Sequence, residues 1–123
     1  MWLPAIQSDE NSHSQRDLAV KIEVQGKSIY YSGDGKPTAE GMELAKGSQL
    51  IIHEAFHMDK EMPGHGTVTG AIDMAKKSGV QTLALIHIQR EIRERVKDGI
   101  EQIADSGELL KIMVPEPGDR ITL

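Results

Sequence analysis

A predicted β-hairpin that ends in an acidic turn is the feature that most constrains the fold of this chain. Apolar residues alternate with other residues over Leu18–Val24, which is the period of a half-buried strand. The turn Gln25-Gly26-Lys27 leads into a return strand over residues 28–31. The segment Tyr31-Ser32-Gly33-Asp34 leaves one carboxylate at the end of that strand, although an Asp in such a turn also commonly caps its own backbone.

Strands and helices alternate after the hairpin. Thr67 is a predicted helix start, and Gly47 and Gly79 are predicted helix stops. The pattern predicts an α/β fold, a mixed sheet with helices in the order ββαβαβαββ. The polar, aperiodic segment of residues 1–16 is expected to be irregular. Helices are predicted over residues 37–46, 67–77 and 91–104, and the further strands over residues 49–52, 80–86, 111–114 and 120–123.

Composition limits the classes of function. A length of 123 residues corresponds to one domain or part of one. A net charge of −5 argues against a general affinity for nucleic acid, which needs a basic surface. No apolar run approaches the roughly 20 residues that span a bilayer, and residues 1–10 do not follow the pattern of a signal peptide. The absence of Cys excludes thiolate chemistry, and a cytoplasmic location without membrane contact is expected.

Two histidines lie where chemistry is commonly placed. His87 comes at the end of a predicted buried strand, the position at which α/β folds place ligands and catalytic groups. His65 lies between two glycines, which would let a substrate approach closely, and it could serve as a proton donor or an anion contact. Together with Asp34, these side chains have the ligand chemistry of zinc, iron and manganese. A purely structural role for each histidine, held by local hydrogen bonds, remains the alternative.

A competing motif is His53-Glu54-Ala55-Phe56-His57, which matches the H-E-x-x-H pattern of zincin metalloproteases. In that class two histidines one helical turn apart hold zinc, and the glutamate activates water. The apolar residues before His53 favour a strand instead, and the nearby Gly and Pro residues leave little room for a long helix. The metzincin extension is also missing. A strand at His53 would exclude this reading.

Short motifs in a fixed order make the chain resemble the metallo-β-lactamase superfamily, and within it the ribonuclease Z-like phosphodiesterase branch. The resemblance covers nearly the whole chain from His13 onward. The matching segments are His13-Ser14, Tyr31-Ser32-Gly33-Asp34 (a YSGDT-type motif), His53-Glu54-Ala55-Phe56 (HEAT-type), His65-Gly66-Thr67 (HST-type), the strand end at His87, and Pro115-Glu116-Pro117-Gly118-Asp119 (AEDG-type).

The resemblance implies a role for each matched residue. Asp34 would bridge two metal ions, and His13 and His87 would each contact one of them. Glu54 would orient His65, which would donate a proton to the leaving oxygen. The implied reaction is hydrolysis of a phosphodiester or an ester by a metal-bound hydroxide, with zinc as the expected metal and manganese or iron as alternatives. The acidic charge favours a small-molecule substrate over nucleic acid.

The departures from the family are as informative as the matches. The H-x-H-x-D-H metal motif of the N-terminal half is absent, and Gly35, Phe56 and Gly66 stand where the family usually has Thr, Thr and Ser. Residues 1–123 are therefore expected to form a single domain resembling the C-terminal half of an αββα sandwich, with weak or no metal binding alone. One bare sheet face predicts a homodimer, or pairing with an N-terminal half. A non-catalytic half-fold that serves as an interaction module is the alternative function.

Overall fold

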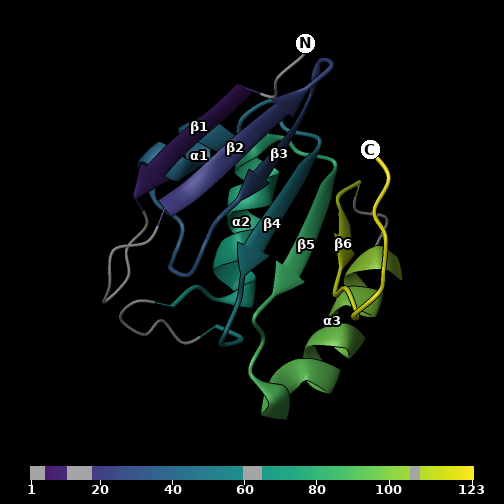
Figure 1. Ribbon diagram of the computed structural model, residues 1–123. Coiled ribbons are helices and arrows are strands. Elements are labelled where there is room, and N and C mark those ends of the chain that lie inside the picture. Colours follow the sequence, from purple (N-terminus) through teal and green to yellow (C-terminus); the bar gives the residue numbers. More distant parts are fainter. Residues whose placement is uncertain (1–4, 11–17, 60–64, 106–108) are drawn as a thin grey trace.

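The computed structural model describes residues 5–10, 18–59, 65–105 and 109–123 (Figure 1). Its strands form one mixed sheet in the order β1-β2-β3-β4-β5-β6. The pairs β1–β2 and β2–β3 are antiparallel, and the pairs β3–β4, β4–β5 and β5–β6 are parallel. The strands are β1 (Ala5–Glu10), β2 (Leu18–Val24), β3 (Lys27–Tyr31), β4 (Leu50–Glu54), β5 (Thr82–Ile86) and β6 (Lys111–Met113).

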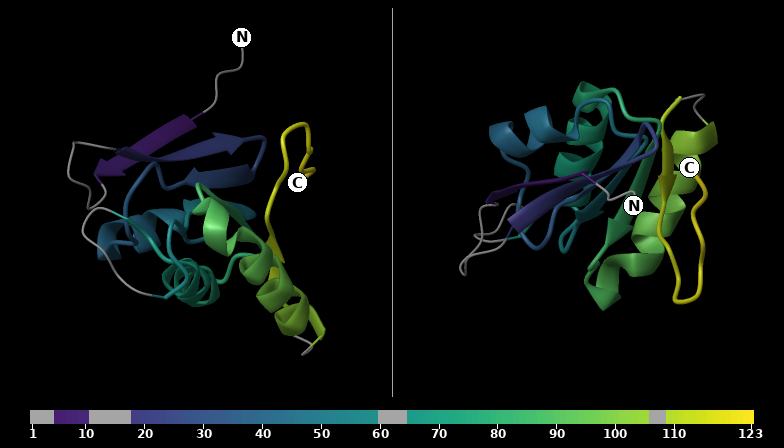
Figure 2. Two further views of the ribbon diagram at one scale, coloured as in Figure 1. Left: turned by 90° about the horizontal axis from the view of Figure 1, so that it is seen from below. Right: turned by 45° about the horizontal axis from the view of Figure 1, so that its top comes forward.

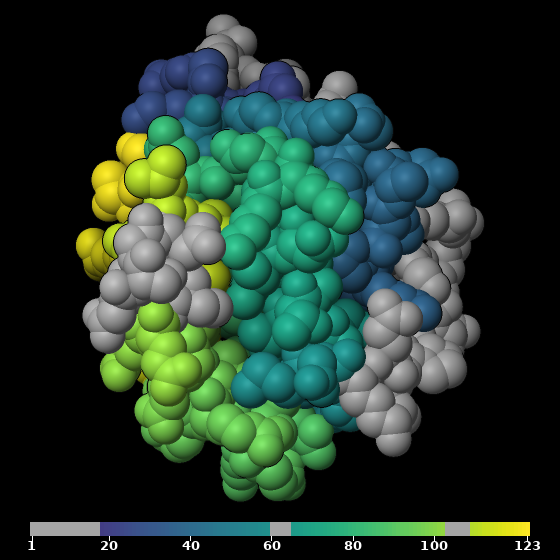
Figure 3. All heavy atoms as spheres, turned by 180° about the vertical axis from the view of Figure 1, so that it is seen from behind, coloured from purple at the N-terminus to yellow at the C-terminus, as the bar shows by residue number. Residues whose placement is uncertain are grey.

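The helices α1 (Ala39–Ala45) and α2 (Val68–Ser78) cover one face of this sheet, whereas the short 3-10 helix η1 (Arg90–Ile92) leads into α3 (Arg93–Asp105) beside β6 (Figure 2). Seen from behind, α2 lies between α1 and α3 (Figure 3). The Thr67 hydroxyl accepts a hydrogen bond from the Gly70 N–H at 2.9 Å and so caps α2. Gly79 ends α2 in the left-handed conformation, at a φ of 73°. Both signals were predicted from the sequence.

The hydrophobic core lies between the sheet and the helices. It is built from strand residues that alternate towards the helices and from the apolar side of α2. This arrangement explains why the period-two and helical patterns were readable in the sequence. The fully buried members of the core include Tyr30, Ile51, Met74, Leu83 and Leu85.

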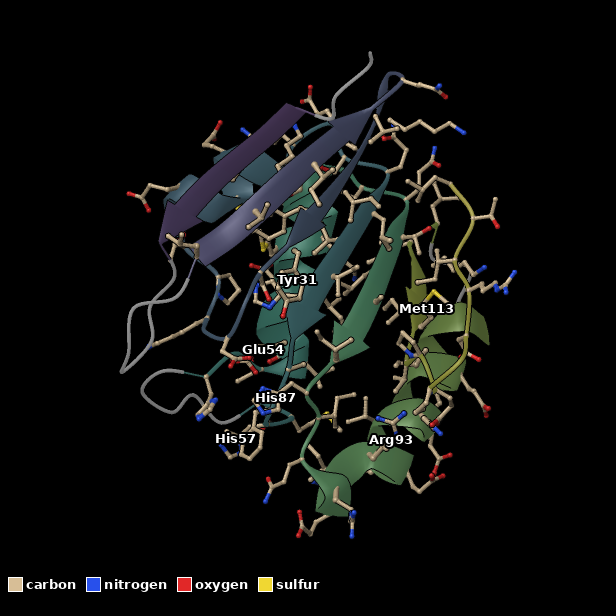
Figure 4. The ribbon with its side chains drawn as sticks, viewed as in Figure 1. Tyr31, Glu54, His57, His87, Arg93 and Met113 are labelled. Carbon is tan, nitrogen blue, oxygen red and sulfur yellow. The ribbon has the colours of Figure 1, made fainter. Side chains whose placement is uncertain are left out.

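The opposite face of the sheet carries exposed apolar side chains. Leu18, Ile22, Val24 and Tyr31 are each between 36% and 43% exposed, and the register pairs Ile22 with Ile29. We call these five residues the open sheet face. Tyr31 projects from the side of the sheet that the helices leave uncovered (Figure 4). Within the described part of the chain, no helix combines the length and apolar character needed to cross a membrane.

The α/β class and the mixed sheet are confirmed, but both ends of the predicted order are wrong. Ala5–Glu10, expected to be irregular, pairs as β1 with β2. Backbone hydrogen bonds to an existing strand hold such an edge, so its side chains need not alternate. Residues 120–123, expected to form a strand, have no regular structure. Instead, the Lys27 Nζ atom donates a hydrogen bond to the Leu123 carbonyl oxygen at 2.8 Å, next to the hairpin.

Candidate functional site

The buried carboxylate of Glu54 organises the carboxyl end of the sheet. Glu54 is the last residue of β4, and it is completely buried. Its Oε1 atom accepts hydrogen bonds from the backbone N–H of Gly35 at 3.0 Å and of Gly66 at 2.6 Å. Its Oε2 atom accepts one from the backbone N–H of Phe56 at 3.1 Å. A buried carboxylate is tolerated only when it is satisfied in this way, and these three bonds tie separate segments to one point.

His65 lies beside this carboxylate. Its Nδ1 atom is 3.6 Å from the Glu54 Oε1 atom, and its ring stacks on Phe56 with centroids 4.8 Å apart. Hydrogen bonding of the adjacent Gly66 N–H to Glu54 fixes the backbone that carries the imidazole. The structure therefore brings together the pair that the HEAT-type and HST-type motifs suggested.

Asp34 and His87 meet at the same end of the sheet. Asp34 follows β3 and His87 follows β5, with β4 between them, so parallel pairing places both residues at one edge. The His87 Nδ1 atom lies 3.2 Å from the Asp34 Oδ1 atom, and both side chains are nearly half exposed. The labels of Glu54 and His87 mark this end in Figure 4.

The backbone of His87 is itself unusual. Its backbone φ is +55°, in the left-handed region that residues other than glycine seldom adopt. Such strain persists only where the surroundings impose it, and it is concentrated at functional sites. The conformation turns the chain directly after β5 and presents the imidazole to Asp34.

Asp34 and His87 are of the residue types that bind metal ions, but two side chains are too few to hold one firmly. A carboxylate oxygen and an imidazole nitrogen suit zinc, manganese and iron. Among the residues that the structure describes, however, no group of three or more His, Asp or Glu side chains could hold a metal ion. His13, the third predicted ligand, lies outside the described residues. Asp34 and His87 are therefore two candidate ligands, fewer than the three or four protein ligands of a zinc site.

The zincin interpretation is wrong. His53 lies inside β4 rather than on a helix, so His53 and His57 are not one helical turn apart. His53 is fully buried, and its Nδ1 atom lies 2.8 Å from the Glu54 carbonyl oxygen. Its Nε2 atom is buried with no hydrogen-bond partner among the described residues. Burial accordingly lowers the pKa of His53 to about 4, partly offset by that backbone contact, and keeps the ring neutral.

Phe56 is a site residue that the sequence did not reveal. Its ring centroid lies 4.8 Å from those of His57 and His65 and 5.4 Å from that of His87. It therefore packs against imidazoles from three separate segments. Its place in the HEAT-type motif, two residues after Glu54, was noted only as a departure from the usual Thr. The signal in the sequence was the large apolar ring itself, at a position where the family usually has the smaller, polar Thr.

Comparison with known proteins identifies the family. A family model described as Beta-lactamase superfamily domain matches residues 3–88, so the chain belongs to the metallo-β-lactamase superfamily. It is similar to a protein named Ribonuclease Z from Brevibacillus brevis, with 45% identity over 67 residues, 50% of this chain and 21% of that protein. Ribonuclease Z from Natronomonas pharaonis is 27% identical over 124 residues, 97% of this chain and 40% of that protein.

Solved structures agree on the fold. The metallo-β-lactamase fold protein YhfI from Bacillus subtilis matches with a TM-score of 0.79 and 18% identity, over 95% of this chain and 51% of that chain. The chain spans about half of that structure and well under half of the two ribonuclease Z relatives. It therefore matches part of the metallo-β-lactamase fold, as the sequence motifs predicted.

The three backbone hydrogen bonds to Glu54 generate a stability prediction. In Glu54→Gln, the amide oxygen can still accept hydrogen bonds from the N–H groups of Gly35 and Gly66. The amide NH₂ group, however, would face the N–H of Phe56, and two donors cannot form a hydrogen bond with each other. We expect the free energy of unfolding to fall by about 1–3 kcal/mol, measured by urea denaturation. The matched control is Glu43→Gln, at an exposed residue that forms an ion pair with Lys46, which should change stability by less than about 0.5 kcal/mol. Equal effects of the two substitutions would contradict the anchoring role.

The neutral burial of His53 generates a pH prediction. Its pKa is about 4 in the folded protein, against 6.5 for an unperturbed histidine in the unfolded chain, so the unfolded chain binds this proton first as the pH falls. The contribution is fully present above pH 6.5 and is lost towards pH 4. Between pH 7 and pH 5 it should remove about 2 kcal/mol of stability. The variant His53→Asn has no such titration, and its urea-unfolding free energy should depend less steeply on pH. Identical slopes for both proteins would refute the prediction.

Proposed function

We propose that this chain supplies part of the active site of a metal-dependent hydrolase that cleaves phosphodiesters or esters. The observation that carries the proposal is the Asp34–His87 pair, with 3.2 Å between the Oδ1 and Nδ1 atoms, at the carboxyl end of the sheet. The ring of His65 lies 6.1 Å from that of His87. Two metal-ligand side chains and a candidate proton donor thus share one edge, as metal-assisted hydrolysis requires.

Asp34 and His87 would hold the metal from this chain, with His13 as a further candidate ligand. When bound, zinc, manganese or iron would polarise the substrate and activate water. Because two ligands are too few to hold zinc firmly, we propose that the remaining ligands come from a partner or from an N-terminal half. Membership of the metallo-β-lactamase superfamily supports a metal in this role.

His65 would donate the proton that the leaving oxygen needs. Glu54 acts as a positioning residue, because backbone N–H groups already engage its carboxylate and fix it next to His65. The separation of 3.6 Å between His65 Nδ1 and Glu54 Oε1 exceeds a hydrogen bond, and catalytic contacts of this kind tighten when substrate binds. Phe56, stacked on the imidazole, would restrict its rotation.

The proposed substrate is a phosphodiester. The relatives named Ribonuclease Z support this class over other esters. The net charge of −5 favours a small phosphodiester over a long nucleic acid, whose backbone would be repelled by an acidic surface. An interaction module without catalysis is the second candidate, favoured by the incomplete ligand set among the described residues.

Metal content provides the first test. After dialysis against metal-free buffer, elemental analysis of the chain should find less than one zinc ion per chain, because Asp34 and His87 alone form a weak site. Two tightly held ions would show that the ligand set is complete. In zinc- or manganese-supplemented buffer, the assembly in which a partner completes the ligand set should hydrolyse p-nitrophenyl thymidine 5′-phosphate, and His65→Ala in that assembly should lower turnover about 10²–10⁴-fold with unchanged metal uptake.

The controls separate the roles of the site residues. Asp34→Asn should lower both metal uptake and turnover, whereas loss of metal in His65→Ala would assign His65 as a ligand instead. If metal binds and no hydrolysis occurs in the chain alone, in its dimer or in its complex with an N-terminal half, the non-catalytic interaction module is the correct function.

We also propose that a second copy of the chain covers the open sheet face. Exposed apolar residues such as Ile22, Val24 and Tyr31 lie there on neighbouring strands. Monomers seldom expose a large contiguous apolar patch, and a sheet face pairs readily with its own copy about a two-fold axis. An N-terminal half from the same fold would use the same surface and would displace the second copy.

The oligomeric state tests this surface. Light scattering coupled to gel filtration should find a dimer, and Ile22→Lys should shift it to monomer because an ammonium group would be buried in the interface. Gln102→Lys adds the same charge on the exposed side of α3 and should leave the dimer intact. A monodisperse wild-type monomer at high concentration would contradict the proposal.

A further inference from the structure

A cavity of about 330 Å³ adjoins the candidate site on the helix side of the sheet. It lies between the start of α1 and the first turns of α2, and His65 forms part of its wall. Because the ring of His65 also lies 6.1 Å from that of His87, a ligand in this cavity would reach the edge at which Asp34 and His87 meet. The residues that matter most for its chemistry are Lys36, Thr38, Met42, His65 and Asp73.

Lys36 supplies an uncompensated positive charge to this cavity. It is partly buried, and its side chain forms no hydrogen bond or ion pair in the described part of the chain. The acidic residue that shares the cavity, Asp73, is paired with Lys77 at 3.0 Å on the exposed side of α2. The ammonium group of Lys36 therefore has three donors and no acceptor among the described residues.

Thr38 adds a neutral donor on the same wall. Its hydroxyl oxygen accepts the backbone N–H of Gly41 at 2.9 Å, which leaves the hydroxyl hydrogen to be donated. Met42 provides an apolar surface next to these polar groups. An ammonium group and a hydroxyl donor beside an apolar wall match a phosphate that is attached to an organic body.

We propose that this cavity binds a second phosphate group of the substrate, carried on the same organic body as the phosphodiester that is cleaved. The inference rests on the proposed function, and it narrows the substrate class to molecules that carry at least two phosphates. His65 lines the cavity together with Lys36, and its ring lies 6.1 Å from that of His87, so the two phosphates would lie on either side of His65. Lys36 is the residue that would distinguish such substrates from simple diesters.

Equilibrium binding tests the inference without relying on turnover. Calorimetry would compare thymidine 3′,5′-bisphosphate with thymidine 5′-monophosphate, which lacks the second phosphate. The wild-type chain should bind the bisphosphate about tenfold more tightly, and Lys36→Met should abolish that difference. Lys36→Arg keeps the charge and should restore most of it. Lys46→Met removes an equal charge from an exposed residue paired with Glu43 and should leave the difference unchanged.

Two results would overturn the inference. One is equal binding of both nucleotides by the wild-type chain, and the other is an equal loss in Lys46→Met, which would show a general effect of charge. Turnover of p-nitrophenyl thymidine 5′-phosphate, with and without a 3′-phosphate, gives a separate readout. If neither ester is hydrolysed while binding still depends on Lys36, the phosphate site stands and the proposed hydrolase function fails.

Discussion

The buried carboxylate of Glu54 is the interaction on which the rest of the candidate site depends. A charge inside a protein is stable only when hydrogen bonds replace its hydration. Glu54 obtains these bonds from the segments next to Asp34 and His65, through the N–H groups of Gly35 and Gly66. The same bonds that make its burial tolerable therefore set the positions of the two loops. The hydrogen bonds to the Glu54 carboxylate therefore contribute both to the stability of the fold and to the geometry of the candidate site.

The close approach of these loops explains a departure from the family pattern. A Cβ atom on Gly66 would lie 2.7 Å from the Glu54 carbonyl oxygen and 3.0 Å from that of Gly35. Both contacts are with backbone, which cannot move without breaking the hydrogen bonds to the Glu54 carboxylate. Glycine lets the three segments close around it. His87 completes the edge from the other side, where its left-handed backbone turns the chain towards Asp34.

The sequence predicted those features that recur in a pattern. The hairpin of β2 and β3 and the helix α2 are periodic because one side of each packs on the core. The convergence of Asp34 with His87 was implied by the family resemblance, and the parallel pairing of β3, β4 and β5 produces it. The strand β1 was not predicted because backbone pairing with β2 holds it, and such pairing leaves no pattern in the sequence. The large ring of Phe56 marked its position, but its packing against His65 and His87 could not be predicted, since those residues lie on loops that meet only in the folded chain.

The two faces of the sheet differ in a way that links the incomplete site to the uncovered surface. The helix face has a closed core around Ile51 and Leu83, whereas the open sheet face exposes residues of the same chemical kind. Asp34 follows Tyr31 by three residues, so the Asp34–His87 pair stands at the border of that face. A second sheet packed there would approach the pair as it buried the apolar side chains. Hydrophobic association and completion of the ligand set would then be thermodynamically coupled, each favouring the other.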